Sequence, residues 1–361
     1  MKYHYMLAAS AAALLLGATG AMAQTAGTIN KAVGGYTFED AAKPADATKD
    51  FHSKDGHLTF AIVTHTAGNG FFDPVYVGAK VAADLIGANL VMLGSEAPVH
   101  DIPREIEILN QIIQDPTIDG LILTTPQVGA YNDIVKHMLD QGIPVATTNS
   151  FDPTIYDRDG ISHTGQSAAA AAIGGAALAK CVLDSGATKG SILFPSQTTA
   201  GNVEVNNRVT AAFTAAVKVL SDAGKLDAFT VDAGADQIGI AVNDQDIAGS
   251  LVTLIESRGD VVGMFGPNGA VTPAIVDAVT QKKMEGQICS FGYDLGPKQL
   301  EGIKSGALTG SLGQQPFLQG FWPVMQLYLQ IDRGVAAANL DTRAQVVTKD
   351  NVETVGKRYE N

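Results

Sequence analysis

The chain has 361 residues, of which 46% are hydrophobic and 17% charged, and its formal net charge is -13 at pH 7. This length exceeds what one hydrophobic core usually supports, so we expect two domains, and the composition excludes a disordered chain. A nucleic-acid partner is also excluded, because binding to phosphates requires a basic surface.

The first residues have the pattern of a cleavable export signal. Lys2 precedes an apolar run from Met6 to Leu16, which is too short to span a bilayer. Ala21-Met22-Ala23 is typical of a cleavage site. We therefore expect a signal peptide over residues 1–23, no membrane insertion, and a flexible polar leader over residues 24–56.

After the leader, short apolar runs alternate with stretches of helical periodicity, which indicates βαβ units and a parallel sheet. The first unit has a buried strand over 58–63 and a helix that is capped by Asp73 and places Val77, Val81 and Leu85 on one face. Further strands are predicted over 89–93, 121–124, 144–148, 191–194, 229–232, 261–265, 288–291, 308–312 and 344–347. Long helices are predicted over 167–183, 203–220, 246–257, 271–281 and 317–331.

The chain therefore reads as two successive α/β units, each a doubly wound parallel sheet. Two such sheets side by side direct the carboxyl ends of their strands toward one cleft, which is where ligands bind in open α/β sheets. Export makes a disulfide between Cys181 and Cys289 possible, but two buried thiols remain an equal alternative. Two cysteines without a nearby pair of histidines predict no metal site.

Six motifs follow one another at about one per βα unit. They are Asn69-Gly-Phe-Phe, Asp119-Gly-Leu-Ile-Leu, Gly142-Ile-Pro-Val, Gly266-Pro-Asn268-Gly, Phe291-Gly-Tyr-Asp294 and Gln314-Gln-Pro-Phe-Leu-Gln-Gly. Together they resemble the type I periplasmic binding proteins, specifically the ribose, galactose and xylose receptors of ABC importers. The resemblance implies two lobes joined by a three-segment hinge. The N-terminal lobe would comprise residues 57–164 plus 315–342, and the C-terminal lobe residues 165–314 plus 343–361.

The resemblance also implies a function without catalysis or cofactor. A monomer in the periplasm would close on a neutral monosaccharide or sugar alcohol and deliver it to the permease and ATPase complex of an ABC importer. One alternative is a periplasmic sensor of a sugar-like signal, such as an autoinducer or a chemoreceptor ligand. An exported enzyme is the weaker alternative, because Gly68-Asn-Gly70 lacks the third glycine of a dinucleotide-binding loop.

Carried over to this sequence, the resemblance implies ligand contacts in the loops that follow the strands. The implied residues are His65, Asn69, Phe71, Phe72, Thr125, Asn149 and Ser150 in the first lobe, Asn207, Asn268 and Asp294 in the second, and Gln314 at a crossing between them. Amides donate to and accept from sugar hydroxyls, a carboxylate accepts two charge-assisted hydrogen bonds, and a phenylalanine ring covers a C–H face.

Two positions depart from the family pattern. Ribose-type receptors carry Asp where this chain has Asn149 and Arg where it has Asn207, and Arg208 would point about 100° away on a helix. The loss of two charges favours a neutral ligand and argues against ribose. Asp152 is the candidate to replace the missing carboxylate.

Overall fold

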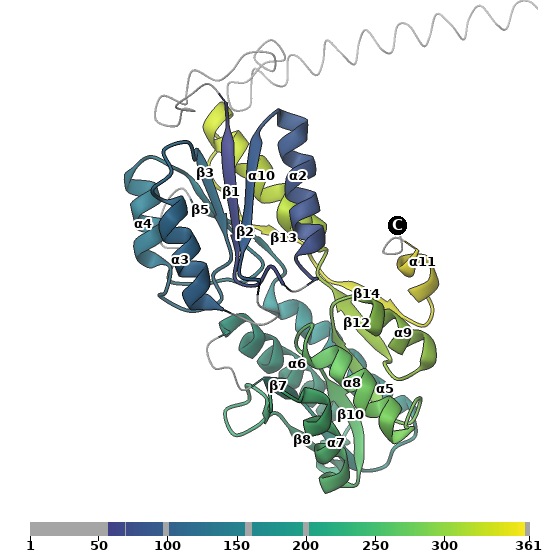
Figure 1. Ribbon diagram of the computed structural model, residues 1–361. Coiled ribbons are helices and arrows are strands. Elements are labelled where there is room, and N and C mark those ends of the chain that lie inside the picture. Colours follow the sequence, from purple (N-terminus) through teal and green to yellow (C-terminus); the bar gives the residue numbers. More distant parts are fainter. Residues whose placement is uncertain (1–56, 69, 97–100, 156–160, 198–201, 358–361) are drawn as a thin grey trace, which may run out of the picture.

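The protein forms two α/β lobes that meet along one boundary (Figure 1). The computed structural model describes residues 57–68, 70–96, 101–155, 161–197 and 202–357. The predicted signal peptide, the leader and Asn69 lie outside these residues. Among the described helices, none combines the length and apolarity that a membrane crossing requires.

The N-terminal lobe is built on a parallel sheet with the strand order β13-β5-β4-β3-β1-β2. Its strands are β1 (Thr59–Thr64), β2 (Asn89–Gly94), β3 (Gly120–Leu123), β4 (Val145–Thr148), β5 (Ile161–Gly165) and β13 (Leu340–Asp341). Its helices are α2 (Asp73–Ile86), α3 (Ile102–Ile112), α4 (Asn132–Asp140) and α10 (Pro316–Arg333).

Successive residues of β1 supply the cores on the two faces of this sheet, because side chains alternate along a strand. Phe60 and Ile62 pack with α2 and α10, whereas Ala61 and Val63 pack with α3 and α4. Strand β1 is therefore covered on both faces, which explains its continuous apolar sequence.

The C-terminal lobe repeats the plan with the strand order β14-β12-β11-β10-β6-β8, in which only β14 runs antiparallel to its neighbour. Its strands are β6 (Gly190–Leu193), β8 (Phe229–Asp232), β10 (Val261–Phe265), β11 (Cys289–Tyr293), β12 (Gly310–Gly313) and β14 (Gln345–Thr348), with a small added sheet of β7 (Pro195–Gln197) and β9 (Ile240–Val242). Its helices are α5 (Ala171–Asp184), α6 (Val203–Asp222), α7 (Ile247–Arg258), α8 (Val271–Lys282), α9 (Pro297–Ser305) and α11 (Val352–Gly356). The predicted doubly wound fold class is confirmed, although β5, β7, β9 and β13 were not predicted.

The face predicted for helix α2 is wrong. Val77, Val81 and Leu85 are exposed by 54%, 39% and 69%, and the opposite face, rich in glycine and alanine, is buried. The reason is the close approach of α2 to α10. A Cβ atom added at Gly320 of α10 would lie 1.8 Å from the carbonyl oxygen of Val75, so only small residues fit between the helices.

The chain crosses between the two sheets three times, after β5, after β12 and after β13. One side chain joins these crossings: Gln166 Nε2 donates to the carbonyl oxygens of Gly313 (3.2 Å) and Arg343 (3.0 Å). Gln315 Nε2 donates to the carbonyl oxygen of Thr342 between the second crossing and the third. The lobe boundaries given above remain predictions.

The structure decides between a disulfide and two buried thiols. Cys181 of α5 and Cys289 of β11 form a disulfide, with their Cα atoms 5.9 Å apart. The bond fastens a helix to the central part of the C-terminal sheet.

Candidate functional site

A cavity that is partly open to solvent lies between the two lobes. Apart from Gln197, which ends strand β7, the lining residues come from loops and helix starts that follow the carboxyl ends of strands, as expected for parallel sheets. The lining residues are His65, Thr66, Phe71, Phe72, Asn149 and Ser150 from the N-terminal lobe, Gln197, Asn202, Glu204, Val205, Arg208, Asn268, Gly269, Ala270 and Asp294 from the C-terminal lobe, and Gln314 from the crossing after β12.

Two aromatic rings and a histidine form the wall next to β1. Phe71 and Phe72 meet edge to face with their centroids 5.2 Å apart, and His65 meets Phe72 in the same way at 5.3 Å. Phe72 is buried and belongs to the core with α2 and α10, whereas Phe71 is only partly buried. Phe71 is therefore the ring available to cover the apolar face of a ligand.

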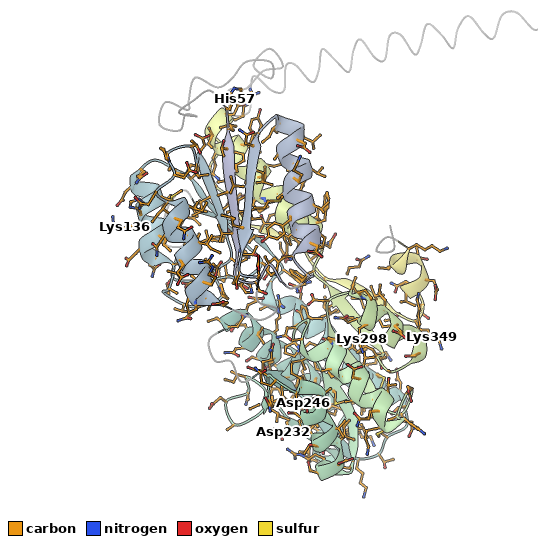
Figure 2. All side chains as sticks on the ribbon, viewed as in Figure 1. His57, Lys136, Asp232, Asp246, Lys298 and Lys349 are labelled. Atoms are coloured by element: carbon orange, nitrogen blue, oxygen red, sulfur yellow. A yellow bond between two sulfur atoms is a disulfide. The ribbon has the colours of Figure 1, made fainter. Side chains whose placement is uncertain are left out.

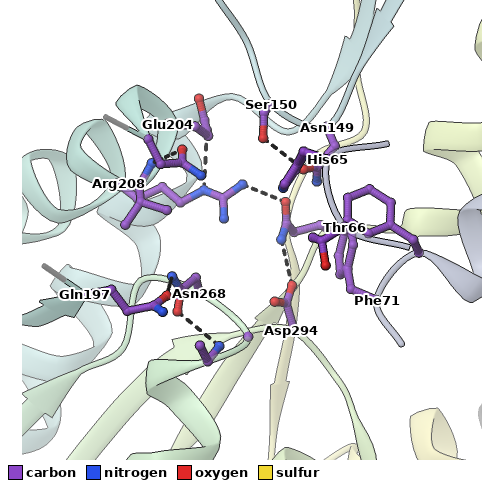
Figure 3. A pocket seen from close by; sticks show the side chains of 16 residues that line it. His65, Thr66, Phe71, Asn149, Ser150, Gln197, Glu204, Arg208, Asn268 and Asp294 are labelled. Atoms are coloured by element: carbon purple, nitrogen blue, oxygen red, sulfur yellow. Dashed lines mark hydrogen bonds and ion pairs between the residues drawn. The ribbon is translucent and has the colours of Figure 1, made fainter. Parts of the chain in front are cut away.

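The opposite wall carries a chain of polar contacts that ends at a carboxylate (Figure 3). Arg208 Nε lies 3.3 Å from Glu204 Oε1, and Arg208 Nη2 donates to Gln314 Oε1 at 2.7 Å. Gln314 Nε2 in turn donates to Asp294 Oδ1 at 2.6 Å. The Arg208 guanidinium also lies over the ring of Tyr293, 4.4 Å from its centroid. These contacts fix the guanidinium in place, so it is prearranged rather than free to follow a ligand.

Burial raises the pKa of both carboxyl groups in this chain. Desolvation is the main cause for Glu204 and for Asp294, and the positive charge of Arg208 opposes it in each case. The hydrogen bond from Gln314 also opposes the rise at Asp294. The cavity therefore holds two carboxyl groups around one guanidinium, and burial disfavours the charged form of each acid.

Several ion pairs of the described residues lie on the outer surface and outside the cavity lining. Lys136 pairs with Asp140, and Lys298 pairs with Asp277. Both lysines lie on the outer surface (Figure 2). Such pairs are screened by solvent. The charged groups that line the cavity are the guanidinium of Arg208 and the carboxyl groups of Glu204 and Asp294.

Asn149 and Asp294 have a backbone conformation that is rare outside glycine. Their φ angles are 61° and 71°, and both residues follow directly after a strand, β4 and β11. Asn and Asp tolerate this left-handed region better than most residues. The chain therefore turns sharply at the end of each strand, and the turn directs the side chain into the cavity.

The amides at the cavity wall already have partners. Asn149 Nδ2 donates to Gln319 Oε1 at 3.1 Å, and Ser150 Oγ donates to Asn149 Oδ1 at 3.1 Å. Asn268 Nδ2 donates to Gln197 Oε1 at 2.8 Å, while its Oδ1 accepts from Val271 N at the start of α8. These contacts hold the amides in fixed orientations, and a ligand meets a rigid polar surface.

Most of the predicted site residues lie together on the cavity wall, but their role as ligand contacts stays a prediction. They are His65, Phe71, Phe72, Asn149, Ser150, Asn268, Asp294 and Gln314. Asn69 lies outside the described residues.

Three expectations require correction. Asn207 is exposed, and Arg208, which is 4% exposed, faces the cavity instead, because the predicted position on α6 was one residue out. Thr125 is buried away from the cavity and donates to the carbonyl oxygen of Ser150. Asp152 is also buried, where it accepts from Gly129 N and Thr154 N, so it does not replace a cavity carboxylate.

Four polar residues of the wall were not predicted: Thr66, Gln197, Asn202 and Glu204. Gln197 belongs to β7, a strand too short for its sequence to indicate. Glu204 was detectable, because it stands four residues before Arg208, and that spacing pairs opposite charges on one helix face.

The described residues contain no group of three His, Cys, Asp or Glu side chains arranged to hold a metal ion. The cavity is instead a mixture of amides, hydroxyls, one guanidinium, two carboxyls and aromatic faces.

Comparison with known proteins identifies the family to which this two-lobed architecture belongs. The family described as a periplasmic binding protein domain matches residues 60–334, which is most of the chain. The protein belongs to this family. A curated relative in sequence is the xylose/arabinose-binding protein XylF of Sulfolobus acidocaldarius, 26% identical over 322 residues that cover 84% of this chain and 75% of that protein.

Solved structures of the family share the fold. A carbohydrate transporter solute-binding protein of Agrobacterium radiobacter, in complex with D-arabinose, superposes with a TM-score of 0.70 at 21% identity, covering 84% of this chain and 98% of that one. A periplasmic solute-binding protein of Actinobacillus succinogenes with bound D-allose gives a TM-score of 0.68 at 17% identity, covering 82% and 99%. These likenesses establish the two-lobed type I architecture.

Proposed function

We propose that this protein is a periplasmic solute-binding protein of an ABC importer and that it binds a neutral monosaccharide or sugar alcohol between its lobes. The observation that carries the proposal is the composition of the cavity wall. Oriented amides, a carboxylate and an aromatic ring line one cavity between the lobes, and small-molecule sites combine apolar faces with a few placed polar groups in this way. One relative named for xylose and arabinose, and two solved structures with bound D-arabinose and D-allose, support the same ligand class.

The charges in the cavity favour a neutral ligand. Glu204 already neutralises Arg208, and Asp294 adds a second acid nearby. An anionic sugar would be repelled by two carboxyl groups and attracted by only one guanidinium, and a cationic ligand would be repelled by Arg208. Neutral hydroxyl groups avoid both repulsions, because each can donate a hydrogen bond to Asp294 and accept one from Arg208.

The mechanism we propose is closure of the lobes around the ligand. The residues that line the cavity come from both sheets, so a ligand that contacts both walls binds the closed form better and shifts the population toward it. The backbone bridge between Gln127 and Asn202 already spans the boundary on the cavity side. The three crossings, near residues 163–166, 312–315 and 342–345, would act as the hinge.

A thermal-shift screen tests the ligand class. We expect a neutral pentose, hexose, tetritol or hexitol to raise the melting temperature in a concentration-dependent way, because a ligand that binds only the native state stabilises it by mass action. A uronic acid of the same ring size serves as the matched charged control and should give no shift. The ligand class proposed here would be refuted if only the uronic acid stabilised the protein, or if no sugar or polyol did.

Small-angle scattering tests closure separately. Saturation with the stabilising sugar should reduce the radius of gyration relative to the free protein. An unchanged radius would contradict the closing mechanism while leaving sugar binding intact.

A further inference from the structure

A buried carboxyl group lies behind the cavity wall of the N-terminal lobe. Glu105 of α3 is fully buried, and it is not a lining residue. Its Oε2 lies 2.6 Å from Tyr131 Oη, and its Oε1 lies 2.7 Å from Thr124 Oγ1. Burying an acid is costly unless hydrogen bonds compensate for the lost water, so these two contacts define its environment.

Thr124 connects Glu105 to the cavity. Its Oγ1 accepts a hydrogen bond from the backbone N–H of His65 at 2.9 Å and lies 2.8 Å from His65 Nδ1. His65 lines the cavity, and its Nε2 is on the side of the ring opposite Nδ1. A continuous chain of hydrogen bonds thus leads from Glu105 through one hydroxyl to an imidazole at the cavity wall.

The Thr124 hydroxyl couples Glu105 to His65, because it can form only a limited number of hydrogen bonds. A threonine hydroxyl donates one hydrogen bond and accepts two. The backbone N–H of His65 occupies one acceptor position of Thr124. Of the two remaining contacts, to His65 Nδ1 and to Glu105 Oε1, one must therefore be donated by Thr124 and the other accepted.

Tyr131 determines which oxygen of Glu105 takes part. Its hydroxyl is buried, and Glu105 Oε2 is the acceptor within its reach. If Glu105 donated a proton to Tyr131, the Tyr131 O–H would lose that acceptor, which is unfavourable in the core. The proton of a neutral Glu105 is therefore best placed on Oε1, where it faces Thr124.

We propose that Glu105 is a positioning residue that sets the tautomer of His65 through Thr124. When Glu105 is protonated, Oε1–H donates to Thr124, Thr124 donates to His65 Nδ1, and His65 carries its proton on Nε2. When Glu105 ionises, one proton leaves to solvent, Thr124 donates to Glu105, and the imidazole proton resides on Nδ1. His65 Nε2 thereby changes from a hydrogen-bond donor to an acceptor.

The electrostatic surroundings favour the protonated form at neutral pH. Burial raises the pKa of Glu105 to about 8, and the hydrogen bonds from Tyr131 and Thr124 only partly oppose it. Within the described part of the chain, no cationic side chain is among the causes of this shift. The charge of Glu105 helps raise the pKa of Tyr76 on α2, and Asp152 helps raise that of Tyr131. We therefore expect His65 Nε2 to donate below pH 8 and to accept above it.

Nitrogen NMR of the ligand-free protein labelled in its histidine rings measures the tautomer directly. In the wild-type protein, the proton of His65 should move from Nε2 to Nδ1 between pH 6.5 and pH 9.5, with a midpoint at about 8. H65Q identifies the signal. E105Q should hold the Nε2–H form at every pH, because its amide donates to Thr124 and accepts from Tyr131.

Three further variants separate the relay from a merely structural role. T124S keeps the hydroxyl and should keep the transition, whereas T124V should abolish it. E107Q removes an exposed acid on the same helix, which pairs with Arg104, and should leave the transition unchanged. A single His65 tautomer across the pH range in the wild type, or an unaltered transition in E105Q, would overturn the proposal.

The consequence for ligand affinity rests on the proposed function, but the tautomer measurement does not. If the cavity binds D-arabinose, the affinity of the wild type should differ at least several-fold between pH 6.5 and pH 9.5, and that of E105Q should differ less. Absence of sugar binding would refute the proposed function while leaving the tautomer result valid. Equal pH dependence in both proteins would show that the ligand does not depend on His65 Nε2.

Discussion

Replacing Asp294 with asparagine should change ligand binding and protein stability in different directions. The substitution preserves shape but removes the acceptor charge at the end of the Arg208–Gln314–Asp294 chain. Hydrogen bonds to charged groups contribute about 1.5 to 3 kcal/mol each. Loss of one such bond to a sugar hydroxyl should therefore weaken binding about 10- to 150-fold.

The stability of the ligand-free protein should not fall in parallel. Because the pKa of Asp294 is raised in the folded protein, its ionised form is disfavoured by folding at neutral pH, and removal of the charge relieves that cost. We expect a melting temperature equal to or above that of the wild type. The contact with Gln314 survives, since the amide oxygen of the introduced side chain still accepts from Gln314 Nε2.

Calorimetric titration with the sugar that gives the largest thermal shift, together with melting curves without ligand, measures both effects. D277N is the matched control, because Asp277 is an exposed acid of the same lobe that pairs with Lys298. Wild-type affinity in D294N would remove Asp294 from the ligand site. A large drop in melting temperature would instead show that its charge stabilises the fold, contrary to the direction of its pKa.

Further perturbations test the packing and the buried titratable groups. G320A should destabilise the protein by about 1 to 3 kcal/mol in urea unfolding, because the new methyl group collides with the backbone of Val75; wild-type stability would show that the two helices can separate freely. Reduction of the Cys181–Cys289 bond should lower the unfolding free energy by about 4 to 5 kcal/mol, since it spans 108 residues, and an unchanged urea midpoint would contradict this. Burial lowers the pKa of His163 to about 4, so its contribution to stability should be complete above pH 6.5 and lost as the pH falls toward 4; H163Q should flatten the pH dependence of unfolding in that window. Glu105 acts in the opposite sense, because its pKa of about 8 means that its contribution is complete below pH 4.5 and lost as the pH rises to 8, and a slope retained in E105Q would refute the assignment.

The sequence was sufficient for the fold class and for half of the residues that line the cavity. Buried strands are continuous apolar runs, and the residues after parallel strands necessarily meet at one edge of a sheet. The family resemblance implied Asn149, Asn268 and Asp294 at such positions, and all three line the cavity. The same rule could not assign Arg208, because a helix rotates by about 100° per residue, and an error of one position here replaced the buried Arg208 by the exposed Asn207.

Hydrophobic periodicity failed where two backbones approach closely. On α2 the larger apolar residues Val77, Val81 and Leu85 face outward, because the contact with Gly320 and its neighbours leaves room only for glycine and alanine. Glu105 escaped prediction for a related reason. A charged residue in a helix is normally exposed, and only the three-dimensional contacts with Thr124 and Tyr131 reveal why this one is buried.

The amide of Gln166 joins the three crossing segments by hydrogen bonds. Because Gln166 donates hydrogen bonds to both Gly313 and Arg343, a rotation of one crossing segment would strain its bonds to the other two. We therefore expect the lobes to rotate about one axis rather than segment by segment. Substitutions at this amide would then alter how often the ligand-free protein visits its closed form. Apparent affinity would change in proportion to that fraction, although no atom of Gln166 lines the cavity.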